Sequence, residues 1–205
     1  LHIPVAHVEA GLRSFNRRMP EEINRVLTDH LADRLFCPTR AAIEHLRREG
    51  ITDGVMHTGD VMYDAALIFG RLAAGRSTVI ESLGLTPKAF YLATVHRAEN
   101  TDDVTRLTAI VRALIEASTS ACPVVWPLHP RTRSRLEAYG LLASLHDAVR
   151  LIEPVDYWDM VQLEQSAAAI LTDSGGIQKE AYFHRTPCVT LRDETEWTET
   201  VEAGW

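Results

Sequence analysis

Short apolar runs alternate with longer segments of helical period along the whole chain, and this alternation limits the possible folds more than any other feature. Strands buried on both faces appear as continuous apolar runs, and helices connect one parallel strand to the next. The pattern therefore predicts an α/β protein with parallel sheets. The expected strands cover 4–9, 34–37, 54–58, 90–95, 123–127, 149–152, 168–172 and 187–191, and the expected helices cover 20–33, 39–49, 61–75, 101–118, 131–139, 156–166 and 176–185.

The first expected helix has an amphipathic pattern. Pro20 suits its first turn, and Glu21 and Glu22 fall on the polar face or at the exposed N-terminal end. The apolar residues that recur at helical spacing are Ile23, Val26, Leu27 and Leu31.

One stretch separates two series of βα units. It runs from Ala73 to Lys88, carries Gly75, Gly84 and Pro87, and contains no strong strand. We interpret it as a crossover at 73–87 between two domains. The remaining chain then divides into the following two domains: 1–72 and 88–205.

Composition narrows the range of partners. The chain is 46% hydrophobic and 24% charged with a formal net charge of -7, so it lacks the clustered Lys and Arg that nucleic acid requires. No apolar run approaches the ~18 residues of a membrane span, so no membrane insertion is expected. The three cysteines form no C-x-x-C pair, which indicates small buried hydrophobes in a reduced, cytoplasmic compartment. The histidines show no metal-ligand spacing.

The strongest local motif is TDSGGIQKEA at 172–181. An apolar strand leads into a Ser-Gly-Gly turn, Ser174 to Gly176, and a helix follows. Glycines let a ligand approach the backbone, and the N–H groups and dipole of a helix N-terminus favour an anion. Glu180 lies one turn down this helix, where its carboxylate could accept two ribose hydroxyls. A diphosphate site is predicted, and a plain strand-to-helix turn is the alternative.

Polar residues also follow two other expected strands. HRAEN at 96–100 comes directly after the strand at 90–95, and ligands of open parallel sheets bind beyond the carboxyl ends of strands. The alternative is a capped helix start with an ordinary surface Glu99. His129 lies at another strand end and, taken alone, fits a structural role better than a functional one.

A third motif places carboxylates in unlike surroundings. Glu9, in HVEAGLR at 7–13, follows a strand predicted to be buried, which favours a protonated carboxyl suited to proton transfer. Glu21 starts a helix, whose dipole favours the ionised form. Such pairs recur as acid and base. The alternative is a strand-end Glu paired with Arg13 and a solvated first turn.

Together these motifs resemble the non-hydrolysing UDP-N-acetylglucosamine 2-epimerases. The resemblance implies a GT-B-like fold of two Rossmann-like domains facing across a cleft. It also implies a cytoplasmic homodimeric isomerase that needs no cofactor and serves surface polysaccharide synthesis. Such enzymes eliminate UDP to leave a 2-acetamidoglucal and add it back with C2 inverted, interconverting UDP-GlcNAc and UDP-ManNAc. The matching segments are HVEAGLR at 7–13, PEEINR at 20–25, HRAEN at 96–100, LHP at 128–130, TDSGGIQKEA at 172–181 and LRDETEW at 191–197.

The same resemblance implies roles for single residues. Glu9 and Glu21 match the acid–base carboxylates, and His96 matches a histidine near the diphosphate that assists the departure of UDP. Arg97 and His129 match a site for a second, activating substrate molecule. The positions that match the binding of UDP and its sugar are Arg13, Arg97, Val155, Met160, Ser174, Gly175, Gly176 and Glu180.

Some features depart from the family pattern. The family's N-terminal segment and its C-terminal helix are absent, so the first domain is expected to be incomplete, the second truncated, and the isolated chain able to bind UDP without turnover. Trp197 replaces an Arg, Met160 an aromatic residue and Val155 a Gln. Relatives that act on UDP-2,3-diacetamido-glucuronic acid share the Glu-Trp variant, so that sugar is an alternative substrate. A GT-B glycosyltransferase and a hydrolysing epimerase are further alternatives.

Overall fold

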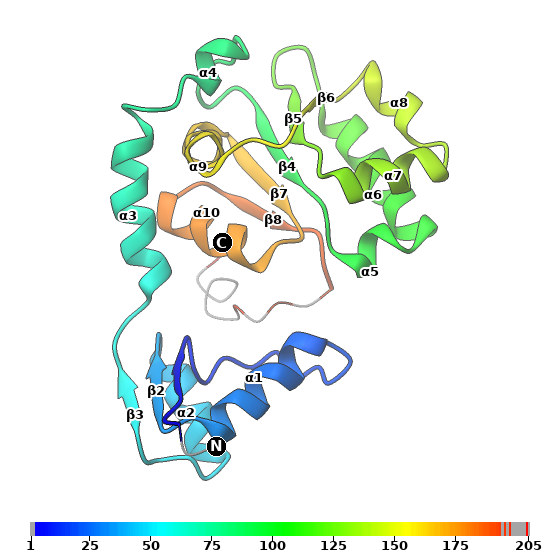
Figure 1. The fold of residues 1–205 in the computed structure, drawn as a ribbon. Coiled ribbons are helices and arrows are strands. Elements are labelled where there is room, and N and C mark those ends of the chain that lie inside the picture. Colours follow the sequence, from blue (N-terminus) through cyan, green and yellow to red (C-terminus); the bar gives the residue numbers. More distant parts are fainter. Residues whose placement is uncertain (1–2, 194, 196, 198–203, 205) are drawn as a thin grey trace. The chain divides into compact units, whose positions relative to one another are not determined.

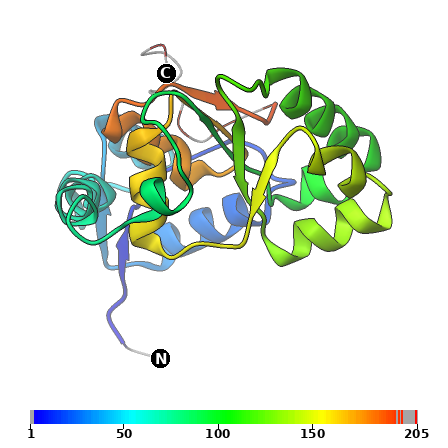
Figure 2. The same cartoon turned by 90° about the horizontal axis from the view of Figure 1, so that it is seen from above.

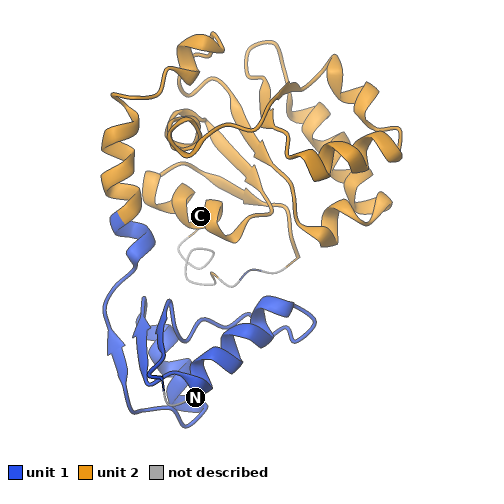
Figure 3. Cartoon of the chain, in the orientation of Figure 1, with its two compact units in different colours: residues 1–64, 194–196 blue, residues 65–193, 197–205 orange. Residues whose placement is uncertain are grey.

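A computed structural model describes residues 3–193, 195, 197 and 204 (Figure 1). The chain divides into two compact units, of which unit 1 contains residues 3–64 and unit 2 contains residues 65–193 (Figure 3). The division falls within α3 (Val61–Ala73), whereas the predicted crossover at 73–87 contains a short helix, α4, that packs on α9 of unit 2. The domain limits predicted for the family fold stay a prediction.

Unit 1 is built on a three-stranded parallel sheet in the order β1-β2-β3. Each strand is joined to the next by a helix, as the sequence pattern predicts. Thr39 caps the second helix, since its side chain accepts a hydrogen bond from the Ala42 N–H. The elements of this unit are β1 (Ala6–Val8), α1 (Pro20–Leu31), β2 (Arg34–Cys37), α2 (Arg40–Arg48) and β3 (Val55–His57).

The polar, exposed position predicted for Glu22 on α1 is wrong. Ile23 and Leu27 are 44% and 56% exposed, whereas Glu22 and Asp29 are buried. Burying a carboxylate is favourable only when donors replace its water, and both acids accept hydrogen bonds from the segment between β1 and α1. These bonds compensate for the burial of Glu22 and Asp29 on α1.

Unit 2 contains a five-stranded sheet in the order β6-β5-β4-β7-β8, and all its strand pairs are parallel. The predicted strands and long helices are confirmed within a few residues at each end. Three short helices, α4, α5 and α8, were not predicted. The elements are α4 (Val79–Ser82), β4 (Tyr91–Thr94), α5 (Ala98–Thr101), α6 (Val104–Ala117), β5 (Val124–Pro127), α7 (Pro130–Ala138), α8 (Leu142–His146), β6 (Arg150–Ile152), α9 (Tyr157–Ser166), β7 (Ala169–Thr172), α10 (Gly175–His184) and β8 (Cys188–Thr190).

Helices cover both faces of the unit 2 sheet (Figure 2). Successive strand residues point to opposite faces, so Ala93 packs with α6, α7 and α8, while Leu92 packs with α4, α9 and α10. Trp126, fully buried, belongs to the first of these clusters. Double-sided burial explains why the strands are continuous apolar runs in the sequence.

The strand order of unit 2 reverses between β4 and β7. From β4 the chain proceeds to β5 and β6 on one side, and then to β7 and β8 on the other. In open parallel sheets the crevice beyond the carboxyl ends of strands at such a switch point is the usual ligand site. The loops that follow Thr94 and Thr172 therefore meet where a ligand is expected.

Two further predictions concern thiols and membranes. Cys37 is buried, as predicted, whereas Cys122 and Cys188 are half-buried. Within the part of the chain that the structure describes, no helix is long and apolar enough to cross a membrane.

Candidate functional site

A buried aspartate joins the two loops at the switch point of unit 2. Asp173 follows β7 and is fully buried. Its carboxylate accepts the backbone N–H groups of His96 at 3.1 Å and Arg97 at 3.0 Å, and the Asn100 side-chain amide at 3.0 Å. Asp173 therefore fixes the HRAEN loop against the Ser-Gly-Gly turn. Sequence reasoning missed Asp173 and Asn100 as site residues, although an acid directly after a buried strand was the available signal.

His96 is held at this site with its side chain 43% exposed. Its Nδ1 lies 3.5 Å from Asp173 Oδ1. Partial burial lowers the pKa of His96, the positive charges of Arg97 and His129 lower it further, and Asp173 opposes them. Near neutral pH the imidazole is therefore neutral, with one N–H donor and one acceptor nitrogen. The influence of His129 also shows that the ends of β4 and β5 bring these histidines into electrostatic range.

The Ser-Gly-Gly turn begins α10 as predicted. Ser174 caps the helix, with its Oγ accepting the Ile177 N–H at 3.4 Å, and its own N–H donates to Thr172 Oγ1 at 2.9 Å. Gly175 and Gly176 occupy the first turn, where backbone N–H groups have no intrahelical acceptor. The Ser174 hydroxyl hydrogen remains available to donate, because the cap uses only an oxygen lone pair. The turn therefore presents donors suited to a phosphate.

Glu180 lies on α10, after this turn, and is half-buried. Its Oε1 accepts a hydrogen bond from the Tyr157 hydroxyl at 3.0 Å. Burial raises the pKa of Glu180, while the Tyr157 hydrogen bond and the positive charge of Lys179 lower it. An ionised carboxylate keeps further lone pairs for hydroxyl donors.

The remaining predicted binding residues of unit 2 have ordinary structural contacts. Val155 and Met160 are half-buried and pack against the core cluster beneath α9 and α10. His129 is exposed and caps α7, where its Nδ1 accepts the Arg131 N–H at 3.2 Å. Neither fact tests the ligand roles predicted for these residues.

The HVEAGLR segment of unit 1 forms a tightly bonded loop. Glu9 is half-buried and has a φ of 67°, a conformation that non-glycine residues adopt rarely and often at functional sites. Gly11 has a φ of 80°, and a Cβ there would lie 2.3 Å from the Ala42 carbonyl oxygen. One expectation is wrong: the strand before Glu9 is not buried, because Val8 is 55% exposed.

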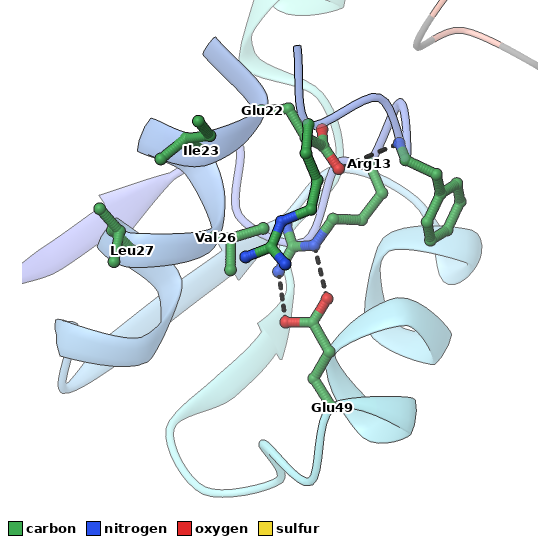
Figure 4. A pocket seen from close by; sticks show the side chains of 8 residues that line it. Arg13, Glu22, Ile23, Val26, Leu27 and Glu49 are labelled. Carbon is green, nitrogen blue, oxygen red and sulfur yellow. Dashed lines mark hydrogen bonds and ion pairs between the residues drawn. The ribbon is translucent and has the colours of Figure 1, made fainter. Parts of the chain in front are cut away.

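Arg13 holds this loop through two acids. Its guanidinium donates to both carboxylate oxygens of Glu49 at 2.7 and 2.8 Å, and to Asp29 Oδ2 at 2.7 Å. The carboxylates raise the pKa of Arg13 against the opposing effect of burial. Arg13 is 3% exposed and lines one wall of a pocket of about 290 Å³ beside α1 (Figure 4). It therefore has a structural function here, and the predicted contact with substrate stays a prediction.

The two adjacent glutamates of PEEINR differ sharply. Glu22 is buried, and its carboxylate accepts the backbone N–H groups of Ser14 at 2.8 Å and Phe15 at 3.0 Å. Glu21 is exposed in the first turn of α1. Glu22 thus anchors the loop, and the acid–base role predicted for Glu21 stays a prediction.

The structure brings several of the predicted residues of unit 2 together. In unit 2, His96, Arg97 and the Ser174 turn converge on Asp173. In unit 1, Glu9 lies between His7 and Gly11, which Asp29 holds, and Glu21 is the second residue of α1.

Comparisons with known proteins identify a family. A family model described as UDP-N-acetylglucosamine 2-epimerase matches residues 1–205. A UDP-2,3-diacetamido-2,3-dideoxy-D-glucuronate 2-epimerase of Pseudomonas aeruginosa is 53% identical over 208 residues, covering 100% of this chain and 56% of that protein. A UDP-N-acetylglucosamine 2-epimerase of Methanocaldococcus jannaschii is 45% identical, covering 100% of this chain and 57% of that protein.

Solved structures show the same likeness. The crystal structure of the Methanocaldococcus jannaschii UDP-GlcNAc 2-epimerase in complex with UDP-GlcNAc and UDP matches with a TM-score of 0.88, over 98% of this chain and 56% of that one. A Neisseria meningitidis UDP-GlcNAc 2-epimerase bound to UDP-GlcNAc matches with a TM-score of 0.79 at 34% identity, over 98% of this chain and 56% of that one. The chain thus spans a little over half the length of these relatives.

Proposed function

The chain belongs to the UDP-N-acetylglucosamine 2-epimerase family, since the family model matches residues 1–205, and on this premise we propose that the protein inverts C2 of a UDP-linked 2-acetamido sugar. The observation that carries the proposal is the phosphate-type turn of unit 2, fixed by Asp173 at the switch point of the sheet. UDP-GlcNAc is the first proposed substrate, and UDP-ManNAc its product.

The proposed UDP site uses α10 and its neighbours. Ser174, Gly175 and Gly176 bind the diphosphate through hydroxyl and N–H donors at a helix N-terminus. Glu180 accepts the ribose hydroxyls. Uracil lies against the segments that contain Val155 and Met160.

The proposed chemistry depends on the leaving group. The C2–H of the sugar is not acidic, so breaking the bond from C1 to the UDP oxygen must contribute much of the elimination. Loss of the C2 proton and of UDP leaves a 2-acetamidoglucal with a C1–C2 double bond. Donors preorganised around the diphosphate stabilise the charge that develops on UDP. His96 assists this departure by donating a hydrogen bond from its neutral imidazole.

Inversion requires proton transfer on both faces of C2. We assign this to two carboxylates, Glu9 and Glu21, one taking the proton and the other delivering it before UDP adds back to C1. The strained backbone of Glu9 supports a functional placement of its side chain. Arg13 supports the Glu9 loop. No redox cofactor is required by this scheme, because no hydride leaves the sugar.

Two further parts of the proposal concern regulation and assembly. Arg97 and His129, whose charges both influence His96, are proposed to hold a second, activating nucleotide sugar. The enzyme is proposed to be a cytoplasmic homodimer that serves surface polysaccharide synthesis.

A second candidate substrate is UDP-2,3-diacetamido-2,3-dideoxy-D-glucuronic acid. It is supported by the 53% identity to the Pseudomonas aeruginosa enzyme named for that sugar. The reaction and the proposed UDP site would be the same, and the difference would lie in the groups around C3 and C6.

Product analysis tests these proposals. The protein is incubated with each UDP-sugar without an acceptor, and the products are separated by chromatography. A C2 epimer still attached to UDP supports the epimerase, and the faster of the two sugars identifies the substrate. Release of UDP with free N-acetylmannosamine would indicate a hydrolysing enzyme. UDP binding with no new sugar from either substrate would contradict the proposal and favour a transferase that needs an acceptor.

A further inference from the structure

An acid on α9 is buried without any hydrogen-bond donor. Glu164 is fully buried, and neither of its carboxyl oxygens has a hydrogen-bond partner among the described residues. The imidazole of His184 lies close to this carboxyl, with its Nε2 3.8 Å from Glu164 Oε2. That nitrogen is also buried and lacks a hydrogen-bond partner within the described part of the chain. A carboxylate in such surroundings would lose its hydration with nothing to replace it.

Several titratable groups face Glu164, and most do not favour a negative charge on it. Glu180 on α10 acts on it as a like charge. Tyr157 on α9 and Cys188 on β8 are neutral groups near the two acids. The two lysines of this region act on other groups. Lys179 lowers the pKa of Glu180, and Lys88, which precedes β4, lowers the pKa of His184.

The donors around the two acids are unequal. Glu180 receives the Tyr157 hydroxyl at 3.0 Å and the field of Lys179. Glu164 receives neither. When two carboxyl groups repel each other and share one proton, the group with fewer donors and deeper burial keeps it. The proton therefore belongs on Glu164, and the charge on Glu180.

We propose that Glu164 is a positioning residue for Glu180: it carries a proton at neutral pH and thereby leaves Glu180 as the ionised carboxylate available to ribose hydroxyls. This inference rests on the proposed role of Glu180 in UDP binding. His184, whose Nε2 lies 3.8 Å from Glu164 Oε2, is neutral as well.

Titration energetics agree with this placement. Burial raises the pKa of Glu164 well above its usual range, and the charge of Glu180 adds to that rise. Burial lowers the pKa of His184. A carboxyl whose pKa is higher in the folded than in the unfolded state makes the native state bind more protons. Its stabilising contribution is full below the unfolded pKa and is lost as pH rises towards the folded pKa.

The first test is thermal unfolding of three proteins from about pH 5 to about pH 8: wild type, Glu164→Gln and the exposed control Glu137→Gln. Gln is neutral at every pH, so the Tm of Glu164→Gln relative to wild type should rise by about 3 °C per pH unit. Glu137→Gln should show no such trend. A flat or falling difference for Glu164→Gln would mean that Glu164 is ionised, and would overturn the proposal. If Glu164→Gln does not fold, Glu164→Met is measured in its place. Met also has no charge at any pH, and a buried site suits an apolar side chain.

The second test is UDP affinity by calorimetry over the acid range. Protonation of Glu180 should weaken binding as pH falls, and the midpoint should be the same in wild type and Glu164→Gln, because Glu164 is neutral in both. If Glu164 were ionised, Glu164→Gln would remove a repulsion and move the midpoint to lower pH. Glu180→Gln should bind UDP weakly at every pH. No UDP binding by wild type would contradict the proposed function, while the unfolding data would still decide the protonation of Glu164.

Discussion

Two buried aspartates organise the two units, and their partners differ in kind. Asp29 in unit 1 contacts His7 at 2.6 Å, the Gly11 N–H at 3.1 Å and the Arg13 guanidinium at 2.7 Å. Asp173 in unit 2 accepts two backbone N–H groups and one amide, with the His96 imidazole further away at 3.5 Å. One aspartate is neutralised by a buried cation, and the other is solvated by neutral donors.

The two clusters also differ in how much of their side chains is left exposed. The Asp29 network is closed, since each charged group in it has a protein partner: Arg13 also donates to Glu49. This network fixes the loop that contains Glu9. The Asp173 network is open, because it holds His96 with nearly half of its side chain exposed beside the N-terminus of α10. The first cluster supports a loop, whereas the second leaves the His96 imidazole partly exposed next to a helix N-terminus.

Asp29→Ala should give the largest effect on stability. The substitution removes one of the two carboxylates that pair with the buried Arg13. Breaking a buried ion pair lowers the free energy of unfolding by about 3–5 kcal/mol. Urea unfolding measures the loss, with exposed Asp53→Ala as the matched control. UDP affinity of the remaining folded protein should change little. A loss below about 1 kcal/mol would contradict a closed ionic network.

Asp173→Asn should weaken UDP binding more than it affects folding. The NH₂ group of Asn would replace one carboxylate oxygen and point at N–H groups that now donate to that oxygen. The lost hydrogen bonds cost about 1.5–3 kcal/mol. Those N–H donors belong to the loop that contains His96, so the loop should lose its fixed position. The Kd for UDP should then rise about tenfold or more. Calorimetry checks this, with the exposed Asp147→Asn as control. Unchanged affinity would show that the loop does not depend on Asp173.

Gly11→Ala should destabilise unit 1 by about 2 kcal/mol or more, through backbone strain and the contact with the Ala42 carbonyl. Gly50 has the same φ of 80° but no atom within 4 Å of an added Cβ. Gly50→Ala is therefore a matched control that reports strain alone. Equal losses in the two variants would rule out the close approach at Gly11 as the cause.

The pH dependence of His96 should be the smallest effect. A lowered pKa means that the native state binds fewer protons than the unfolded state. The contribution of His96 is therefore present above pH ~6.5 and is lost as pH falls towards the folded pKa, amounting to roughly a few tenths of a kcal/mol at this exposed site. NMR titration should give a pKa below ~6.5 for His96. His129→Asn should raise the pKa of His96. An unchanged pKa would show that His129 does not act on His96.

Much of the fold could be predicted because the strands are continuous apolar runs. The burial of Glu22 and Asp29 on α1 could not, because it depends on backbone N–H donors of the preceding loop, whose conformation no sequence period shows. The three short helices contain too few residues to show a helical period.

The candidate site was predicted in part. The Ser174 turn and His96 are recognisable because glycines and polar residues directly follow apolar strands. Asp173 was passed over, since only the pairing of β4 with β7 shows that it meets the His96 loop. Glu164 carries no signal in the sequence, because an acid on an amphipathic helix is usually solvated.

The most direct test of the proposed function follows the C2 proton itself. The protein is incubated with UDP-GlcNAc in deuterated water, and the sugar is observed by proton NMR. Epimerisation through removal and return of this proton predicts loss of the C2 proton signal together with growth of a manno epimer still linked to UDP. An epimer that retains its C2 proton, or an unchanged spectrum with both candidate sugars while UDP binds, would contradict the account.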